Sequence, residues 1–184
     1  MSYDPTAVAA VLAQWQQSPP PFYQAAFAQA GSLNTVADLA QLPLTTREAL
    51  LADQLAHPPF GTRRSGDAGT PVRVGISGSG ATLLVLAWSH AELARERAAG
   101  VRLFEQVGIR AGMRVANVLP GALATPGSLL LGDVNEALGA LDIPTGVITD
   151  AASAERAWTL LDLVQPDVMI LDRSSAPLLF AHAP

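Results

Sequence analysis

The stretch from Ser77 to Thr82 holds the residue types that could best do chemistry in this chain. Its residues are Ser77-Gly78-Ser79-Gly80-Ala81-Thr82, between an apolar run that ends at Ile76 and a second that begins at Leu83. Small residues let several backbone N–H groups point at one anion, and hydroxyl groups add further donors. The loop contains no lysine or arginine of its own. The pattern therefore predicts either a weakened phosphate-binding loop or a tight turn between two strands.

A second candidate is the stretch from Asn117 to Gly127, which follows an apolar strand. In parallel sheets the loops at the carboxyl ends of strands border ligand crevices. Leu119, Leu123 and Thr125 could line an acyl pocket there, and the alternative is a purely structural loop. A third feature is a modest group of positive charges, for which we expect a solvated surface, with an anion site as the alternative: Arg63, Arg64 and Arg73.

Other kinds of catalytic site are excluded by composition. The chain has no cysteine, and all eleven basic residues are arginines, so thiolate chemistry and lysine-based phosphate binding are both closed to it. Its three histidines stand far apart in the sequence, with no spacing typical of metal ligands or of a Ser–His–Asp triad. We therefore expect no catalytic residue and no metal site in this chain.

The elements that position these residues change in type along the chain. Residues 1–56 predict a helical segment, residues 57–71 a connecting loop rich in Pro and Gly, and residues 72–184 an α/β subdomain. In the last part, strands alternate with helices at the spacing of a mostly parallel sheet with crossover helices. The expected strands are 72–76, 83–88, 114–119, 145–148 and 167–171, and the expected helices are 90–107, 128–141, 153–164 and a short one that Ser174 or Ser175 begins.

The length and net charge of the chain favour a single compact domain and disfavour a nucleic-acid-binding protein. The chain has 184 residues, 49% of them hydrophobic, and a net charge of −5. This length suits one compact domain with its own core. Nucleic-acid binding is disfavoured because it needs clustered positive charge. The sequence shows neither a signal peptide nor an apolar run of membrane-spanning length, so we expect a cytoplasmic protein.

Four motifs in order resemble the N-terminal part of the phenylacetate–coenzyme A ligase group of adenylate-forming ligases. Residues 42–48 (LPLTTRE) with 59–61 (PFG) are similar to that group's lead-in segment. Residues 76–82 (ISGSGAT) fall where the group has its Ser/Thr/Gly phosphate loop. Residues 88–92 (WSHAE) resemble the opening of the next helix, and 163–169 (LVQPDVM) resemble a helix-to-strand passage.

The phosphate loop departs from the pattern of the resembled group. Gly80 stands at a threonine of that group, Ala81 at its last glycine and Leu83 at its proline. Gly80 removes a hydroxyl donor, and Ala81 disfavours a positive φ by roughly 1 kcal/mol. The group's later motifs, which hold adenine, ribose and magnesium and supply a catalytic lysine, do not occur in these residues. The resemblance thus implies ATP, Mg²⁺ and CoA as cofactors of a whole enzyme, with none expected for this chain alone.

Two functions follow as expectations. The first is a truncated or divergent acyl-CoA ligase-like protein that is not competent alone. The alternative is a non-catalytic binding or assembly module, either a homodimer or a complex with a partner polypeptide that covers the truncated face, with Ala176 to Pro184 near the contact. Exposed apolar surface of that kind is usually hidden by association.

Overall fold

The computed structural model describes residues 4–66, 68–78, 82–119 and 126–184, and the chain divides into two compact units. The first unit comprises Met1–Thr70 and Gly78–Ala87, and the second comprises Pro71–Ser77 and Trp88–Pro184. Strands β1 (Arg73–Ser77) and β2 (Leu84–Trp88) pair as a two-stranded sheet.

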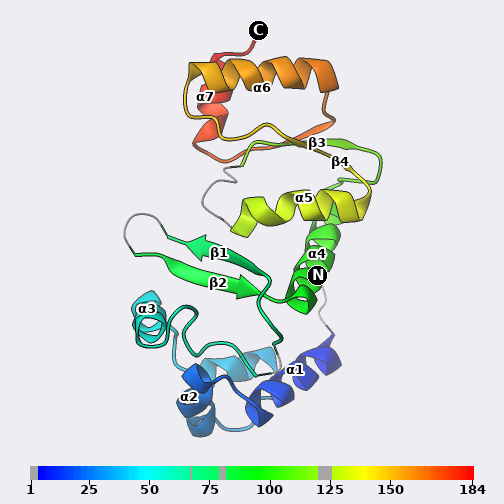
Figure 1. Ribbon diagram of the computed structural model, residues 1–184. Helices are drawn as coiled ribbons and strands as arrows, with labels where there is room; N and C mark the ends of the chain where they lie inside the picture. The colour runs from blue at the N-terminus through cyan, green and yellow to red at the C-terminus, as the bar shows by residue number, and fades with distance from the viewer. Residues whose placement is uncertain (1–3, 67, 79–81, 120–125) are drawn as a thin grey trace. The chain divides into compact units, whose positions relative to one another are not determined.

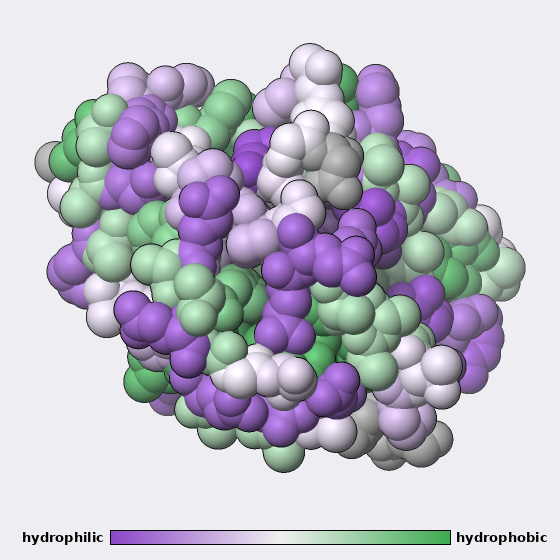
Figure 2. All heavy atoms as spheres, turned by 90° about the horizontal axis from the view of Figure 1, so that it is seen from below, coloured by the Kyte–Doolittle hydropathy of each residue, from purple (hydrophilic) through white to green (hydrophobic). Residues whose placement is uncertain are grey.

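The first unit is mainly helical. Its α-helices are α1 (Pro5–Gln17), α2 (Gln24–Gln29) and α3 (Arg47–Ala56), with 3₁₀ turns η1 (Pro21–Tyr23) and η2 (Val36–Gln41) between them. Asp4 caps α1 through a hydrogen bond from the Thr6 N–H. Figure 2, which views the molecule from below, shows hydrophobic residues intermixed with hydrophilic ones over that face.

The second unit contains the parallel sheet. Its further helices are α4 (His90–Gln106), α5 (Pro126–Leu138), α6 (Ala151–Val164) and α7 (Ser175–Ala181). Strands β3 (Arg114–Asn117), β4 (Leu141–Pro144) and β5 (Val168–Ile170) form a three-stranded sheet in the order β4-β3-β5, and β3 runs parallel to both neighbours. The predicted α/β class with crossover helices is therefore confirmed.

Helices cover this sheet on both faces (Figure 1). Ala116 and Ile143 pack on one face against α6 and α7, where Ala157 and Leu179 are buried. Val115 points to the other face and packs with α4 and α5. Because side chains alternate along a strand, neighbouring residues of β3 belong to different cores. This arrangement explains why the apolar run at Val168–Ile170 is continuous.

The predicted strand at residues 145–148 is wrong, since β4 lies at Leu141–Pro144. Helix α5 ends at Leu138, three residues before the predicted end, because Gly139 adopts a φ of 78°. The Gly139 N–H bonds the Glu136 carbonyl and the Ala140 N–H bonds the Asn135 carbonyl, which is the pairing of a Schellman cap. The chain then enters the sheet at once, and Ile148 is buried without being in a strand.

No helix among the described residues is long and apolar enough to cross a membrane.

Candidate functional site

The predicted phosphate loop begins where β1 ends. Ser77 is the last residue of β1, and Gly78 follows with a φ of +108°, a conformation that favours glycine. Gly78 and Thr82 are exposed. Ser79, Gly80 and Ala81 lie outside the described residues.

Helix α3 places an arginine against this loop, which sequence reasoning missed. The Arg47 Nη2 atom donates a hydrogen bond to the Thr82 carbonyl at 3.2 Å. A Cβ atom on Gly78 would lie 2.2 Å from the same Nη2, so the guanidinium rests on the α-carbon of Gly78. The loop itself contains no lysine or arginine, but Arg47, which stands 31 residues before Gly78 in the sequence, lies beside it. The one local signal was Thr46, which caps α3 through the Ala49 N–H and thereby fixes where Arg47 begins the helix.

Side chains rather than a strand hold the outer edge of β2. The Gln54 amide donates to the Leu83 carbonyl at 3.0 Å and accepts from the Val85 N–H at 2.7 Å. Arg63 donates to the Val85 carbonyl at 3.1 Å, and Arg64 to the Ala87 carbonyl at 2.6 Å. An edge strand covered in this way does not offer those groups to another strand.

The three arginines of the predicted positive region, Arg63, Arg64 and Arg73, therefore make hydrogen bonds and ion pairs within the protein. Arg63 and Arg64 bind backbone carbonyls. Arg73, in the second unit, pairs with Asp133 at 2.6 Å, and Arg97 approaches the same carboxylate at 3.6 Å. Because these guanidinium groups serve the fold, we do not place an anion site on them.

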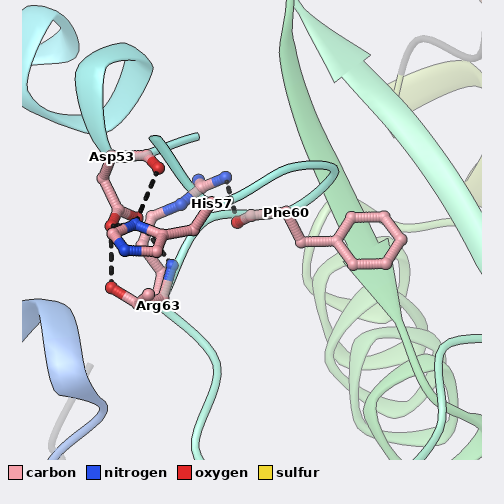
Figure 3. A network of polar contacts seen from close by, with 5 residues as sticks. Asp53, His57, Phe60 and Arg63 are labelled. Atoms are coloured by element: carbon pink, nitrogen blue, oxygen red, sulfur yellow. Dashed lines mark hydrogen bonds and ion pairs between the residues drawn. The ribbon is translucent and has the colours of Figure 1, made fainter. Parts of the chain in front are cut away.

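A polar network at the end of α3 fixes the segment that follows it (Figure 3). The Asp53 carboxylate accepts from the Thr62 N–H and hydroxyl, both at 2.7 Å, and lies 3.3 Å from His57 Nδ1. Burial raises the pKa of Asp53, but the hydrogen bonds from Thr62 and the contact with His57 outweigh it and leave the pKa lowered. Arg63 donates to the Phe60 carbonyl at 2.9 Å, and the Phe60 ring points away from the polar groups in Figure 3. This network holds Arg63 in the position from which it reaches β2.

The second candidate site lies at the carboxyl ends of the parallel strands. Asn117 ends β3 and is buried, and its side-chain oxygen accepts from the Leu119 N–H at 3.1 Å. The Asn117 carbonyl accepts from the N–H and the hydroxyl of Thr145, both at 3.1 Å. Leu119 is half-buried. Leu123 and Thr125 lie outside the described residues, so the predicted acyl pocket remains a prediction.

A hollow in the described residues lies at the opposite edge of the sheet. It has a volume of about 300 Å³ and is lined by residues from the end of α6 and the start of β5, among them Trp158, Gln165 and Met169. Ligand crevices of open α/β sheets lie outside the carboxyl ends of the strands, so this amino-terminal edge is not where that rule places a site. Within the described residues no three His, Cys, Asp or Glu side chains gather as a metal site.

Comparison with known proteins gives matches in structure alone. No protein-family model and no curated protein sequence matches the chain. A crystal structure of 2-hydroxyisobutyryl-CoA ligase in an open conformation, in complex with 2-HIB-AMP and CoA, matches 95% of this chain with a TM-score of 0.78 and 22% identity. The same enzyme in the thioesterification state, again with 2-HIB-AMP and CoA, matches 89% with a TM-score of 0.74 and 25% identity.

These matches concern part of the larger proteins. The chain covers 40% of the open-conformation structure and 36% of the thioesterification-state structure. A third structure of that enzyme, in the postadenylation state, is covered to 34% with a TM-score of 0.72. The chain therefore has an acyl-CoA ligase-like fold, which corresponds to part of the fold of an adenylate-forming ligase.

Proposed function

We propose that this chain is the amino-terminal α/β part of an acyl-CoA ligase of the phenylacetate–CoA ligase type. The activity would be ATP-dependent formation of an acyl-adenylate, followed by transfer of the acyl group to CoA. The observation that carries the proposal is the match of 95% of the chain, at a TM-score of 0.78, to a CoA ligase. The four motifs at 42–61, 76–82, 88–92 and 163–169 support it independently.

In this proposal the chain supplies the phosphate loop and the scaffold beside it. Loop residues 77–82 would lie along the phosphates, with backbone N–H groups and hydroxyls as donors. Leu119, Leu123 and Thr125 would border the acyl group. The chain contains no lysine, so a lysine for the adenylation step has to come from residues beyond these 184, on the same or on a separate polypeptide.

Calorimetric titration tests this proposal. The purified 184-residue chain should bind ATP–Mg²⁺ or an acyl-adenylate analogue no more tightly than in the millimolar range, and it should form no acyl-CoA. Addition of a polypeptide that carries the remaining ligase motifs should restore acid-dependent exchange of pyrophosphate into ATP. If the chain alone forms acyl-CoA, the proposal that it needs further residues is wrong. If no polypeptide with the remaining motifs binds nucleotide together with the chain, the ligase assignment is wrong.

A second candidate function is assembly, either with a second copy or with a partner polypeptide. Exposed apolar side chains on α6 and α7 favour it: Leu163 is 79% exposed and Phe180 is 50% exposed, with the Phe180 ring edge-on to Trp158 at 6.2 Å. Apolar side chains left in water are a common mark of an interaction surface.

Light scattering tests the assembly proposal. The wild-type chain at tens of micromolar should have the mass of a dimer, and Leu163→Glu should reduce it to a monomer. Leu55→Glu is the matched control, because Leu55 is 80% exposed but lies on α3. A wild-type monomer that also recovers no partner polypeptide would contradict this function.

A further inference from the structure

The outer edge of β5, the long side that faces away from β3, differs from the outer edges of β2 and β4. Side chains from α3 and the segment after it cover the edge of β2. At β4 the N–H groups of Leu141 and Thr145 bond to carbonyls on the β3 side, so the alternate residue Pro144 faces outward. Proline has no N–H to offer to another strand and thus protects that edge. In the described part of the sheet, no strand lies beyond β5.

Met169 directs its backbone groups to this outer edge. The neighbouring Ile170 carbonyl accepts from the Val118 N–H at 3.0 Å, so Ile170 faces β3. Because backbone groups alternate along a parallel ladder, the N–H and the carbonyl of Met169 point away from β3. Outward-facing groups of this kind are a template on which another strand can pair.

The hollow of about 300 Å³ lies beside the same edge, between the end of α6 and the start of β5. Trp158, Leu161 and Met169 form part of its apolar lining. Met169 packs on the face of the sheet that α6 covers. A residue placed opposite Met169 in an added strand points to that face as well, so its side chain would enter the hollow. An unbranched apolar side chain such as methionine suits a gap of irregular shape.

Two charged side chains indicate which strand fits. Asp162 is exposed and lines the hollow near the start of β5, whereas Arg173 is exposed and follows shortly after the end of β5. When two β5 strands pair antiparallel, the start of each lies beside the end of the other. Asp162 of each copy then lies on the same side as Arg173 of the other, and opposite charges meet at both ends of the pair.

Two further carboxylates near the ends of β5 are held within the chain. Asp167 pairs with Arg114 at 3.1 Å. Asp172 accepts hydrogen bonds from the N–H and hydroxyl groups of Ser174 and Ser175. We therefore assign the charge contact across the antiparallel pair to Asp162 and Arg173.

We propose that a second copy of this chain pairs with the outer edge of β5 as an antiparallel strand, with the twofold axis at Met169. The two Met169 residues would exchange both of their N–H···O=C hydrogen bonds, and each Met169 side chain would enter the hollow of the other copy. This inference rests on the assembly function proposed above, to which it gives a defined surface, and it does not depend on the ligase assignment.

Sedimentation velocity of the 184-residue chain measures the dimer dissociation constant, and charge reversal tests the pairing. Asp162→Arg and Arg173→Asp should each weaken the dimer about tenfold, because both ion pairs of the symmetric dimer become repulsive. The double variant should return to within about threefold of wild type, because the charges are then only exchanged. Arg102→Asp is the matched control, since Arg102 is exposed on α4 and its reversal should leave the dissociation constant unchanged.

Hydrogen exchange followed by NMR locates the contact. The Met169 amide should exchange about tenfold or more slowly in the dimer than in Asp162→Arg diluted to the monomer, whereas the Ile170 amide should exchange alike in both. A dimer that ignores the charge reversals, or whose Met169 amide exchanges as fast as in the monomer, would overturn this inference and leave assembly to another surface. A wild-type chain that stays monomeric would overturn the inference as well, and the loss of the assembly function would then depend on whether a partner polypeptide is recovered.

Discussion

Gly78 combines a φ of +108° with a guanidinium packed against its α-carbon. Replacing it with alanine should strain the backbone and push Arg47 away, because the new Cβ would lie 2.2 Å from Nη2. We expect Gly78→Ala to lower the free energy of unfolding by about 2–3 kcal/mol. Chemical denaturation followed by circular dichroism measures this.

Two other glycines separate the effect of a positive φ from the effect of the close contact with Arg47. Gly108 has a φ of +94° but open space around it, so Gly108→Ala should cost only about 1 kcal/mol. Gly66 has open space and no positive φ, so Gly66→Ala should stay within about 0.5 kcal/mol of wild type. If Gly78→Ala costs no more than Gly108→Ala, the close approach of Arg47 has no energetic effect.

The contact between Arg47 and the loop could not be predicted from the residue types alone. The small residues of 77–82 predict a turn that could accept an anion, and the helical segment predicted for residues 1–56 includes α3. No local pattern predicts that this helix lies along residues 82–85. That placement depends on Gln54 finding the backbone of β2, a contact across about 30 residues. Contacts of this kind depend on tertiary packing.

The boundary of a helix could be predicted where the residues that cap it are adjacent in the sequence. The expected start of a helix at residue 90 is correct: Ser89 precedes it, and its hydroxyl accepts from the Glu92 N–H while the Glu92 carboxylate accepts from the Ser89 N–H. The end of α5 was missed, because an apolar pattern from Ser128 to Leu141 does not reveal that Gly139 ends the helix. Because the predicted helix was three residues too long at its end, the strand was predicted at 145–148 instead of Leu141–Pro144. The predicted order of helices and strands is still correct.

Helices α4 and α5 pack closely at Gly100. A Cβ atom there would lie 2.4 Å from Val134 Cγ2, so Gly100→Ala should wedge the two helices apart. We expect a loss of about 1–3 kcal/mol in unfolding free energy, even though alanine favours a helix by about 1 kcal/mol over glycine. Adding Val134→Ala should recover part of that loss, and an additive double mutant would contradict the close contact.

Helix α7 begins at Ser175 with Ser174 as its N-cap residue, as expected, but the Ser174 side chain makes no capping bond and Asp172 accepts from the first N–H groups instead. The Ser174 hydroxyl and N–H and the Ser175 N–H bind Asp172 Oδ1 at 2.6 to 2.7 Å, and the Ser175 hydroxyl binds Oδ2 at 2.8 Å. Hydrogen bonds from the Ser174 hydroxyl, and then from Ser175, lower the pKa of Asp172 to about 2 against the raising effect of burial.

A lowered carboxyl pKa in the folded state stabilises the protein above the unfolded value near 4 and stops doing so as the pH falls to about 2. The wild-type chain should therefore exceed Asp172→Asn in stability by about 1–2 kcal/mol at pH 5, after allowance for solvent screening. That difference should shrink between pH 4 and pH 2. Denaturation at several pH values measures it, and a difference that does not change with pH would contradict the role of the ionised carboxylate.

The buried clusters of the parallel sheet lie within a short stretch of the chain. The cluster with Ala116, Ile143 and Leu179 and the cluster with Phe104 and Val115 together span residues 104–179. A fragment that begins at Ser89 also keeps the cap of α4. It omits β1, and with β1 the ion pair between Arg73 and Asp133.

We therefore expect a fragment of residues 89–184 to fold on its own, with a single cooperative unfolding transition. Both cores stay complete in it, and burial of apolar side chains supplies most of the folding free energy. Its stability should fall below that of the full chain by no more than a few kcal/mol, since the main loss is one partly exposed ion pair and the packing of β1 on α5. Dispersed NMR amide signals and a sigmoidal denaturation curve would verify this. A fragment with the spectrum of an unfolded chain would mean that β1 is needed to hold α5 against the sheet, and Asp133→Asn in the full chain should then destabilise the same region.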